Sequence, residues 1–489
     1  KQVDEPFDYL VPKELEGKIK IGSRVLVPFS SGNREIEGFC VGTADTSGSK
    51  RLKSIIRTAN DTVGFDEDML ELIEWMHKKY LASYLDIIHM IVPSGTALKT
   101  KEWIILENKS EEKSEIRRRI AEILTDNGGS MEFKALKEMC GVDIQNQVRA
   151  MIKEGTLKKE YRQSVDIKDK KIKCVKLICD RETALESAEN LRRKAPVQAK
   201  MLEVLSENEY VSLADLQKFT NGSHSTVKAL EKKKFVNVFD MTVERDPYWN
   251  RVFEKTEKMV PTPEQEYAID EITNSVKSGD GGIYLLHGVT GSGKTEVFMQ
   301  TIENVINMGK SAIMLVPEIS LTPQMVSRFM SRFGGRVAIF HSGLSAGERY
   351  DQWKKIRDGE ADIVIGARSA IFTPLKNIGV IIMDEEHSDT YKSDMSPRYH
   401  ARETAIFRAS QFGAAVVLAS ATPSVESYYK AQTGEYKLLE MNTRYNKNKM
   451  PEISVIDMRS ELEKGNKSML SGKLYNEIEE NLKRGEQTI

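Results

Sequence analysis

The sequence predicts a multi-domain α/β protein that contains a P-loop enzyme fold built on a parallel β-sheet. Three observations support this class. Residues 288–295 fit the phosphate-binding pattern G-x-x-x-x-G-K-[ST], between an apolar strand and a helix. Apolar strands alternate with helical segments over residues 250–445, which is typical of a parallel sheet; the expected strands are residues 282–286, 311–316, 336–340, 362–365, 380–383 and 415–418. A pattern of three helices followed by a strand occurs twice within residues 110–245.

The composition is that of a globular protein and favours no particular class of partner. The 489 residues suffice for roughly three domains. The net charge is −1, from 72 basic and 73 acidic residues that can still be segregated among domains. The four cysteines include no C-x-x-C pair, so neither a zinc site nor a disulfide framework is indicated. No apolar run reaches the ~18 residues that cross a bilayer. We therefore expect a cytoplasmic protein with no membrane partner.

Residues 1–105 are predicted to form a small domain that is β-rich at first. Residues 22–29 and 36–42 are expected to be short strands separated by turn residues. A helical period then extends from residue 66 to residue 84.

Residues 110–245 are predicted to be a winged-helix region with two possible units. The first has helices near residues 116–124, 133–136 and 144–153, followed by a strand at 155–162. The second repeats this order up to a strand at residues 235–239. Winged helices often bind DNA through their third helix. The alternative is a helical packing domain with no nucleic-acid role, because winged helices also dock proteins.

The glycine-rich loop predicts a nucleoside triphosphate site. Its glycines allow the backbone N–H groups to point at phosphate oxygens, and the next helix adds its positive N-terminal end. Lys294 is expected to reach the β and γ phosphates, and the Thr295 hydroxyl to bind Mg²⁺. Gln265 is expected to read the adenine edge through its amide; the alternative is an ordinary helix start capped by Thr262. The predicted ATP-binding residues are Gln265, Gly288, Val289, Thr290, Gly291, Ser292, Gly293, Lys294 and Thr295.

An acidic box at the end of the strand 380–383 supplies the remaining chemistry. In P-loop enzymes such an aspartate holds Mg²⁺ and the next glutamate orients or deprotonates water, roles that suit Asp384 and Glu385. His387 is expected to bond to other motifs and report the nucleotide state. Small hydroxyl residues at 420–422 end another strand and can hydrogen-bond the box. The predicted catalytic residues are Lys294, Asp384, Glu385 and His387, with Thr295 and Asp384 as metal ligands.

Together these residues resemble superfamily-2 helicases. Residues 315–324, 340–345, 365–372, 384–387 and the loop up to 402 are more specifically similar to the bacterial primosomal replication-restart helicases. The resemblance covers nearly the whole chain. It implies that residues 250–445 form a RecA-like ATP-binding lobe and that residues 1–105 form a 3′-DNA-end-binding domain. Residues 446–489, where a strand is expected over residues 452–457 and a helix over residues 471–484, would then begin a second lobe.

The resemblance also implies DNA contacts. Phe7, Asp8 and Tyr9 are similar to the opening motif of the family, where an aromatic ring and a carboxylate suit a free terminal nucleotide. An equally weighted alternative makes Phe7 and Tyr9 core side chains. The loop 388–399 resembles the aromatic-rich loop that couples DNA binding to hydrolysis. Its expected contacts, with Arg368, are the stacking residues Tyr391, Arg398 and Tyr399 and the phosphate ligand Lys392, while His400 and Arg402 tie the loop to the acidic box.

A complete member of this family would be an ATP-dependent 3′-to-5′ DNA helicase that recognises stalled forks and restarts replication by primosome assembly. The implied partners are forked and single-stranded DNA, single-stranded-DNA-binding protein and helicase-loading proteins, at the nucleoid in the cytoplasm. The implied cofactors are ATP and Mg²⁺.

The family continues into a second lobe with a completing arginine and two Zn²⁺ sites. We therefore expect this chain to be a piece of a longer protein that binds ATP and DNA but turns over poorly, with Zn²⁺ bound only in the missing part. The alternatives are another superfamily-2 nucleic-acid translocase and a non-catalytic DNA-binding scaffold. The intact Lys294, Asp384 and Glu385 argue against the scaffold.

Overall fold

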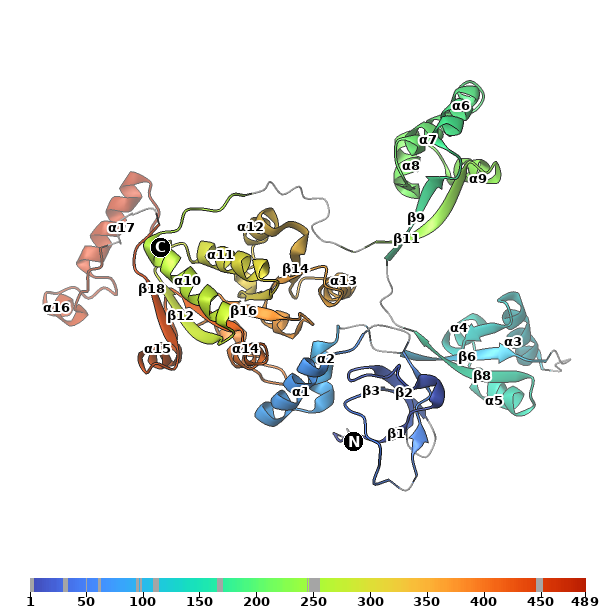
Figure 1. Ribbon diagram of the computed structural model, residues 1–489, viewed down its shortest axis with the longest axis horizontal. Helices are drawn as coiled ribbons and strands as arrows, with labels where there is room; N and C mark the ends of the chain where they lie inside the picture. The colour runs from blue at the N-terminus through green and yellow to red at the C-terminus, as the bar shows by residue number, and fades with distance from the viewer. Residues whose placement is uncertain are drawn as a thin grey trace.

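The computed structural model consists of a large α/β lobe, an N-terminal β domain and two small helical units (Figure 1). It describes residues 4–29, 34–49, 51–59, 63–93, 96, 99–108, 114–164, 170–243, 245, 256–445 and 452–489. The predicted domain boundaries at residues 110, 250 and 446 lie outside these ranges. No helix among the described residues is long and apolar enough to cross a membrane.

The lobe is built on a seven-stranded parallel sheet with the order β14-β15-β13-β16-β17-β12-β18. Its central strands are buried on both faces, which explains their continuous Val, Ile and Leu runs. The strands predicted near residues 282, 311, 336, 362, 380 and 415 are all confirmed. The observed strands are β12 (Gly282–Gly288), β13 (Ser311–Leu315), β14 (Val337–Phe340), β15 (Ile363–Gly366), β16 (Ile378–Met383), β17 (Ala415–Ser420) and β18 (Lys437–Met441).

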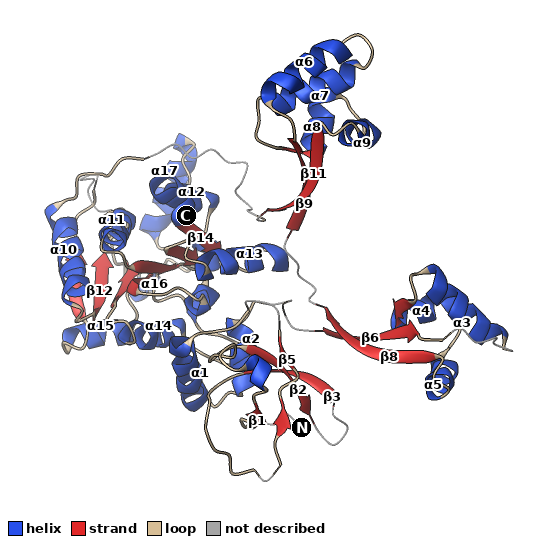
Figure 2. Ribbon diagram, turned by 45° about the vertical axis from the view of Figure 1, so that its right-hand side comes forward, coloured by secondary structure: helices blue, strands red, loops and turns tan. Residues whose placement is uncertain are grey.

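Helices cover both faces of this sheet (Figure 2). One face packs against α10 (Pro263–Ser278), α11 (Lys294–Asn307) and α12 (Pro323–Phe333). The other face packs against α13 (Ala346–Arg357), α14 (Ala401–Ser410), α15 (Val425–Gln432) and the short helix η4 (Arg368–Phe372). This is the RecA-like arrangement that the sequence predicts, with the ligand edge at the carboxyl ends of the strands.

Two helices from the N-terminal region complete the second face. α1 (Glu67–Tyr80) buries Leu72, Ile73 and Met76 in the same hydrophobic core as the sheet. α2 (Tyr84–Ile91) joins this core as well. The helical period expected over residues 66–84 is confirmed as far as Tyr80, where α1 ends. The chain leaves α1 through Leu81 in the left-handed region (φ 51°), and Ser83 caps α2 by accepting the N–H of Asp86.

The region ahead of α1 is the β-rich domain that the sequence predicts. The antiparallel sheet β3-β2-β5 carries most of it, and a short parallel pair joins β1 to β4. The strands are β1 (Tyr9–Leu10), β2 (Arg24–Phe29), β3 (Arg34–Phe39), β4 (Lys53–Ser54) and β5 (Arg57–Thr58), with the 3₁₀ turn η1 (Lys13–Leu15) after β1.

The two helical units each have their own core and three-stranded sheet, so the repeated pattern in the sequence does mark two units. The predicted boundary at residue 105 cuts through β6, which pairs with β8 along its whole length and so belongs to the first helical unit. That unit contains β6 (Lys99–Leu106), α3 (Glu115–Asp126), β7 (Ser130–Glu132), α4 (Phe133–Cys140), α5 (Gln145–Lys153) and β8 (Leu157–Ser164).

The second unit repeats the order with one additional helix, α6, which the sequence pattern did not reveal. Its elements are β9 (Lys170–Leu177), α6 (Arg181–Leu191), α7 (Pro196–Ser206), β10 (Val211–Ser212), α8 (Leu213–Thr220), α9 (His224–Lys232) and β11 (Val236–Val243).

The C-terminal segment contains α16 (Met458–Glu463) and α17 (Gly472–Arg484), which confirms the helix predicted there. The strand predicted over residues 452–457 is absent. Ile453 and Val455 are exposed, and no strand within the described ranges pairs with this segment, so no ladder forms.

Candidate active site and DNA-facing loop

The phosphate-binding loop lies between β12 and α11, where the sequence predicts it. Gly291 and Gly293 have φ values of 80° and 85°, in the left-handed region that favours glycine. A Cβ atom on Gly293 would lie 2.3 Å from Nε2 of Gln265, so a side chain here would displace this amide. Within the loop, the Ser292 N–H donates to the carbonyl of Val289 over 3.0 Å.

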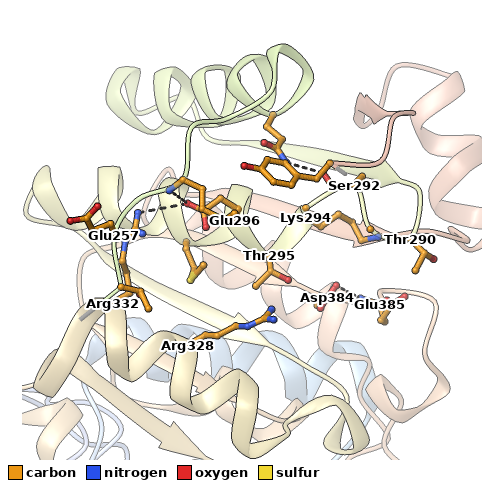
Figure 3. A pocket seen from close by; sticks show the side chains of 17 residues that line it. Glu257, Thr290, Ser292, Lys294, Thr295, Glu296, Arg328, Arg332, Asp384 and Glu385 are labelled. Carbon is orange, nitrogen blue, oxygen red and sulfur yellow. Dashed lines mark hydrogen bonds and ion pairs between the residues drawn. The ribbon is translucent and has the colours of Figure 1, made fainter. Parts of the chain in front are cut away.

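The residues of this loop suit an anionic ligand. Lys294 is partly buried, and Nζ donates to the carbonyl of Gly288 over 2.7 Å. Burial lowers the pKa of Lys294, while the charges of Glu385 and Asp384 act in the opposite direction. The buried Ser292 Oγ has no hydrogen-bond partner among the described residues. A cavity of about 570 Å³ opens beside the loop, so a bound phosphate would meet a cation and free donors (Figure 3).

The acidic box forms the other side of this cavity. Asp384 and Glu385 follow β16, and the Glu385 N–H donates to Oδ1 of Asp384 over 3.0 Å. Burial, together with the neighbouring charge of Glu385, raises the pKa of Asp384 to about 6, while the hydrogen bond from the Glu385 N–H and the charge of Lys294 oppose the shift. Glu385 has a φ of 47°, a conformation that costs a non-glycine residue about 1–2 kcal/mol. Thr295 lines the same cavity, so hydroxyl and carboxylate oxygens suited to Mg²⁺ face it from two elements.

Gln265, in the first turn of α10, holds the phosphate-binding loop through its side-chain amide. Its Oε1 accepts the N–H of Thr262 and its Nε2 donates to the carbonyl of Ser292, both over 2.8 Å. The Thr262 hydroxyl in turn accepts the Gln265 N–H, which completes a capping box at the start of α10. The helix-cap interpretation is thus confirmed. Adenine contact stays a prediction, for which the amide retains one donor and one acceptor.

Two arginines on α12 were not anticipated from the sequence, although their spacing of four places them on one helix face. Arg332 is neutralised, because it contacts Glu303 over 3.0 Å and Glu296 over 3.8 Å. Arg328 makes no hydrogen bond or ion pair with any residue that the structure describes, and it points into the cavity (Figure 3). Tyr445 closes another wall and donates its N–H to the carbonyl of Gly291 over 2.9 Å.

The acidic box contacts the strand and helix that follow it. His387 Nδ1 and Ser420 Oγ lie 2.8 Å apart, so the hydrogen bond expected from the small hydroxyl residues exists. Glu386 was given no role from the sequence, yet its buried carboxylate accepts hydrogen bonds from Ser424, Ser427 and Arg402. Arg402 therefore ties the loop to the acidic box as predicted. Ser424, a helix-capping residue type directly after Pro423, was the available signal for these contacts.

The predicted base stacking by Tyr391 and Tyr399 does not fit their positions. Tyr391 is fully buried, and its hydroxyl lies 2.6 Å from the carbonyl oxygen of Asp384 and 3.0 Å from that of Leu315. Tyr399 is 3% exposed and packs edge-to-face on Phe372. Both rings are core side chains that fix the loop, so aromatic content alone misassigned them.

The charged residues predicted to contact DNA are of two kinds: one holds the loop backbone, and the others are exposed to solvent. Arg368 donates to the carbonyls of Thr390 and Lys392, so this side chain holds the loop. Lys392 and Arg398 are exposed, and Lys392 Nζ donates to the Arg398 carbonyl over 2.7 Å. Met395, which the sequence did not single out, is 80% exposed. The exposed side chains of this loop thus include two cations, the carboxylates of Asp389 and Asp394, and an apolar methionine.

The N-terminal motif is divided between surface and core. Phe7 is 52% exposed and meets Phe29 edge-to-face at 5.4 Å. Asp8 is exposed and accepts the hydroxyl of Ser47. Tyr9 packs against the core of the β domain. Phe7 and Asp8 suit a ligand-binding role, whereas Tyr9 follows the core alternative.

Comparison with known proteins agrees with these two regions. A model of the PriA 3′DNA-binding domain matches residues 1–93, and the DEAD/DEAH box helicase model matches residues 262–431. The replication restart protein PriA of Bacillus subtilis (strain 168) is 40% identical over 494 residues, which cover 100% of this chain and 60% of that protein. This chain belongs to the PriA family.

A second PriA, from Synechocystis sp. (strain ATCC 27184 / PCC 6803 / Kazusa), is 32% identical over 505 residues, covering 99% of this chain and 58% of that protein. The chain thus spans about 60% of the length of these PriA relatives. A solved structure of RecG bound to a three-way DNA junction is 26% identical over 40% of this chain and 24% of that one, with a TM-score of 0.29, too low to support a conclusion.

Proposed function

We propose that this chain is the ATP-binding and DNA-binding part of a replication-restart helicase that moves 3′-to-5′ on DNA and recognises stalled forks. The observation that carries the proposal is one cavity lined by Lys294, Thr295, Asp384 and Glu385. This cavity is connected through Glu386 and Arg402 to the loop that exposes Lys392 and Arg398. A nucleotide site and a polynucleotide surface are therefore linked by direct contacts.

In this proposal each residue of the cavity has one role. Lys294 and the loop N–H groups bind the phosphates, and Thr295 and Asp384 hold Mg²⁺, which neutralises phosphate charge when bound. Glu385 lies next to Asp384 and orients or deprotonates the attacking water. His387 links the box to Ser420 on the neighbouring strand, so a displacement of Glu385 is transmitted to the end of β17. Gln265 holds the loop in shape and contacts adenine.

The DNA contacts that we propose are Lys392 and Arg398 for phosphates and Phe7 with Asp8 for a free 3′ end. Arg368, Tyr391 and Tyr399 then act by holding the loop. We also propose, from the family alone, that the whole protein works with single-stranded-DNA-binding protein and primosome proteins in the cytoplasm at the nucleoid. Zn²⁺ would belong to the part of the protein beyond this chain.

Binding measurements test the nucleotide part of the proposal. We expect the chain to bind a fluorescent ATP analogue with Mg²⁺, and Lys294→Ala to weaken this binding at least tenfold, since it removes the cation that faces the phosphates. Thermal unfolding provides the control, because the variant should retain its melting temperature without nucleotide. Equal nucleotide binding by both proteins would contradict the proposal.

A second measurement tests the choice of polymer. The chain should bind forked DNA with a free 3′ end more tightly than an RNA fork of the same sequence, and Phe7→Ala should reduce only this preference. Equal affinity for both forks would favour a different superfamily-2 translocase.

A further inference from the structure

Tyr80, the last residue of α1, contacts both ends of the loop formed by residues 391–400. Lys392 and His400 pair with each other as an antiparallel β-bridge, which forms the neck of the loop. The ring of Tyr80 lies 6.0 Å from Nζ of Lys392, on one side of this neck. Its hydroxyl accepts the N–H of His400 over 3.4 Å, on the other side, and donates to Glu403 Oε2 over 3.0 Å.

We propose that Tyr80 is a positioning residue that fixes the neck of the 391–400 loop and thereby connects α1 to the acidic box. This inference rests on the proposed function in one respect, that the loop contacts DNA.

The ring of Tyr80 is itself held from two elements. Trp75, five residues earlier on α1, meets it edge-to-face at 5.8 Å. Trp75 also stacks on Phe407 of α14 at 4.6 Å with an interplanar angle of 15°. Lys79 adds an ion pair to Glu403 over 3.7 Å. Because α14 begins where the loop ends, the ring and the end of the loop share one rigid support.

The hydroxyl is suited to act as a permanent donor. Burial raises the pKa of Tyr80 above its ordinary value, and the charge of Glu403 raises it further. The group therefore stays protonated at neutral pH, and its bond to Glu403 is charge-assisted. Tyr80 thus presents one donor and one acceptor to the first turn of α14.

From this turn the contacts continue to the acidic box. His400 Nδ1 accepts the N–H of Arg402 over 3.2 Å and caps α14. Arg402 Nη1 then donates to Glu386 Oε2 over 3.3 Å. Glu386 directly follows Glu385 in the chain. Three consecutive contacts therefore separate Tyr80 from the residue expected to handle the attacking water.

The test replaces Tyr80 by phenylalanine, which keeps the ring and its packing but removes the hydroxyl. Tyr84→Phe is the matched control, because Tyr84 lies on α2 with its ring stacked on His77 at 4.1 Å. Hydrogen exchange of the whole chain is followed by mass spectrometry. Loss of one net hydrogen bond predicts exchange about fivefold faster in residues 391–400 of Tyr80→Phe. Residues of α11, and both regions in Tyr84→Phe, should exchange as in the parent chain.

Two results would overturn the proposal. One is unchanged exchange in residues 391–400. The other is a uniform increase across the lobe or a loss of nucleotide binding, either of which would make the hydroxyl a general packing element.

The affinity for single-stranded DNA separates this inference from the proposed function. We expect Tyr80→Phe to weaken DNA binding about fivefold while nucleotide affinity changes less than twofold. Faster loop exchange with unchanged DNA affinity would support the positioning role and count against the DNA role of the loop.

Discussion

Glu386 Oε1 lies 2.6 Å from the backbone nitrogen of Ser424, so the acidic box is joined to the N-terminus of α15. Its second oxygen accepts the hydroxyl of Ser427 over 2.9 Å and contacts Arg402 over 3.3 Å. The side chain is fully buried. A buried carboxylate is stable only with such partners, and here they come from two different helices.

Replacing Glu386 by glutamine should destabilise the lobe by about 1–3 kcal/mol, because the amide keeps the shape but leaves Arg402 without its charged partner. Denaturant unfolding measures this change. Glu385→Gln is the control, since Glu385 is 38% exposed and its loss should change stability by less than about 0.5 kcal/mol. Equal destabilisation by both substitutions would contradict the role given to Glu386.

The pKa of Asp384, raised to about 6, predicts a pH dependence of nucleotide binding. Mg²⁺ requires the ionised carboxylate, so the affinity for the Mg²⁺ complex of a nucleotide should fall as the pH drops from 7 towards 5. Below the pKa the expected loss is about tenfold per pH unit. Titration of a fluorescent nucleotide at constant free Mg²⁺ measures this. Nucleotide binding without Mg²⁺ serves as the control, and its affinity should not show this loss between pH 7 and pH 5.

The same shift predicts a stability effect of opposite sign. Between the ordinary carboxyl pKa and about 6 the folded chain binds more protons than the unfolded chain, so Asp384 makes the fold less stable as the pH rises through this window. At pH 7 the substitution Asp384→Asn should therefore stabilise the nucleotide-free chain by about 1–3 kcal/mol and abolish Mg²⁺-dependent binding. Lower stability of Asp384→Asn at pH 7 would refute the assigned pKa.

The parallel sheet and the phosphate-binding loop could be predicted from the sequence because their determinants are local. Continuous apolar runs mark strands that are buried on both faces, and the glycine positions of the loop are dictated by backbone conformation. The assignment of Tyr391 and Tyr399 failed for the opposite reason. An aromatic ring in a loop has the same local pattern whether it faces solvent or core, and only the packing of β13 and η4 decides this.

Contacts between segments that are far apart in the sequence could not be predicted from it either. The helical period after residue 66 predicts an apolar face but not its partner, which is a sheet more than 200 residues later. The bonds of Tyr80 to Glu403 and of Arg402 to Glu386 belong to the same class. Each joins elements that come together only when the lobe is folded.

Arg328 provides a test of the nucleotide cavity that does not involve the phosphate-binding loop. Its guanidinium is unpaired among the described residues and points into the cavity, whereas Arg332 one turn away is neutralised by Glu303 and Glu296. Arg328→Gln should weaken ATP binding about three- to tenfold without loss of stability. Arg332→Gln should mainly destabilise α12, because it removes the charged partner of Glu303 and of the buried Glu296. Titration with a fluorescent nucleotide measures the loss of binding, and thermal unfolding measures the loss of stability. Weaker binding by Arg332→Gln together with lower stability of Arg328→Gln would contradict this interpretation of the cavity.

Met76 provides a test of whether α1 is part of the lobe. The side chain is fully buried in the core that α1 shares with the sheet. Met76→Ala should therefore cost about 2–5 kcal/mol, through lost burial and the cavity left behind. If α1 and the sheet unfold together, release of bound nucleotide will shift to lower denaturant by the same amount as the loss of helical signal. Met139→Ala is the matched control, because this methionine is 50% exposed on α4 of the first helical unit and should leave both transitions unchanged. If nucleotide release stays at the parent midpoint while the helical signal shifts, α1 unfolds separately from the lobe.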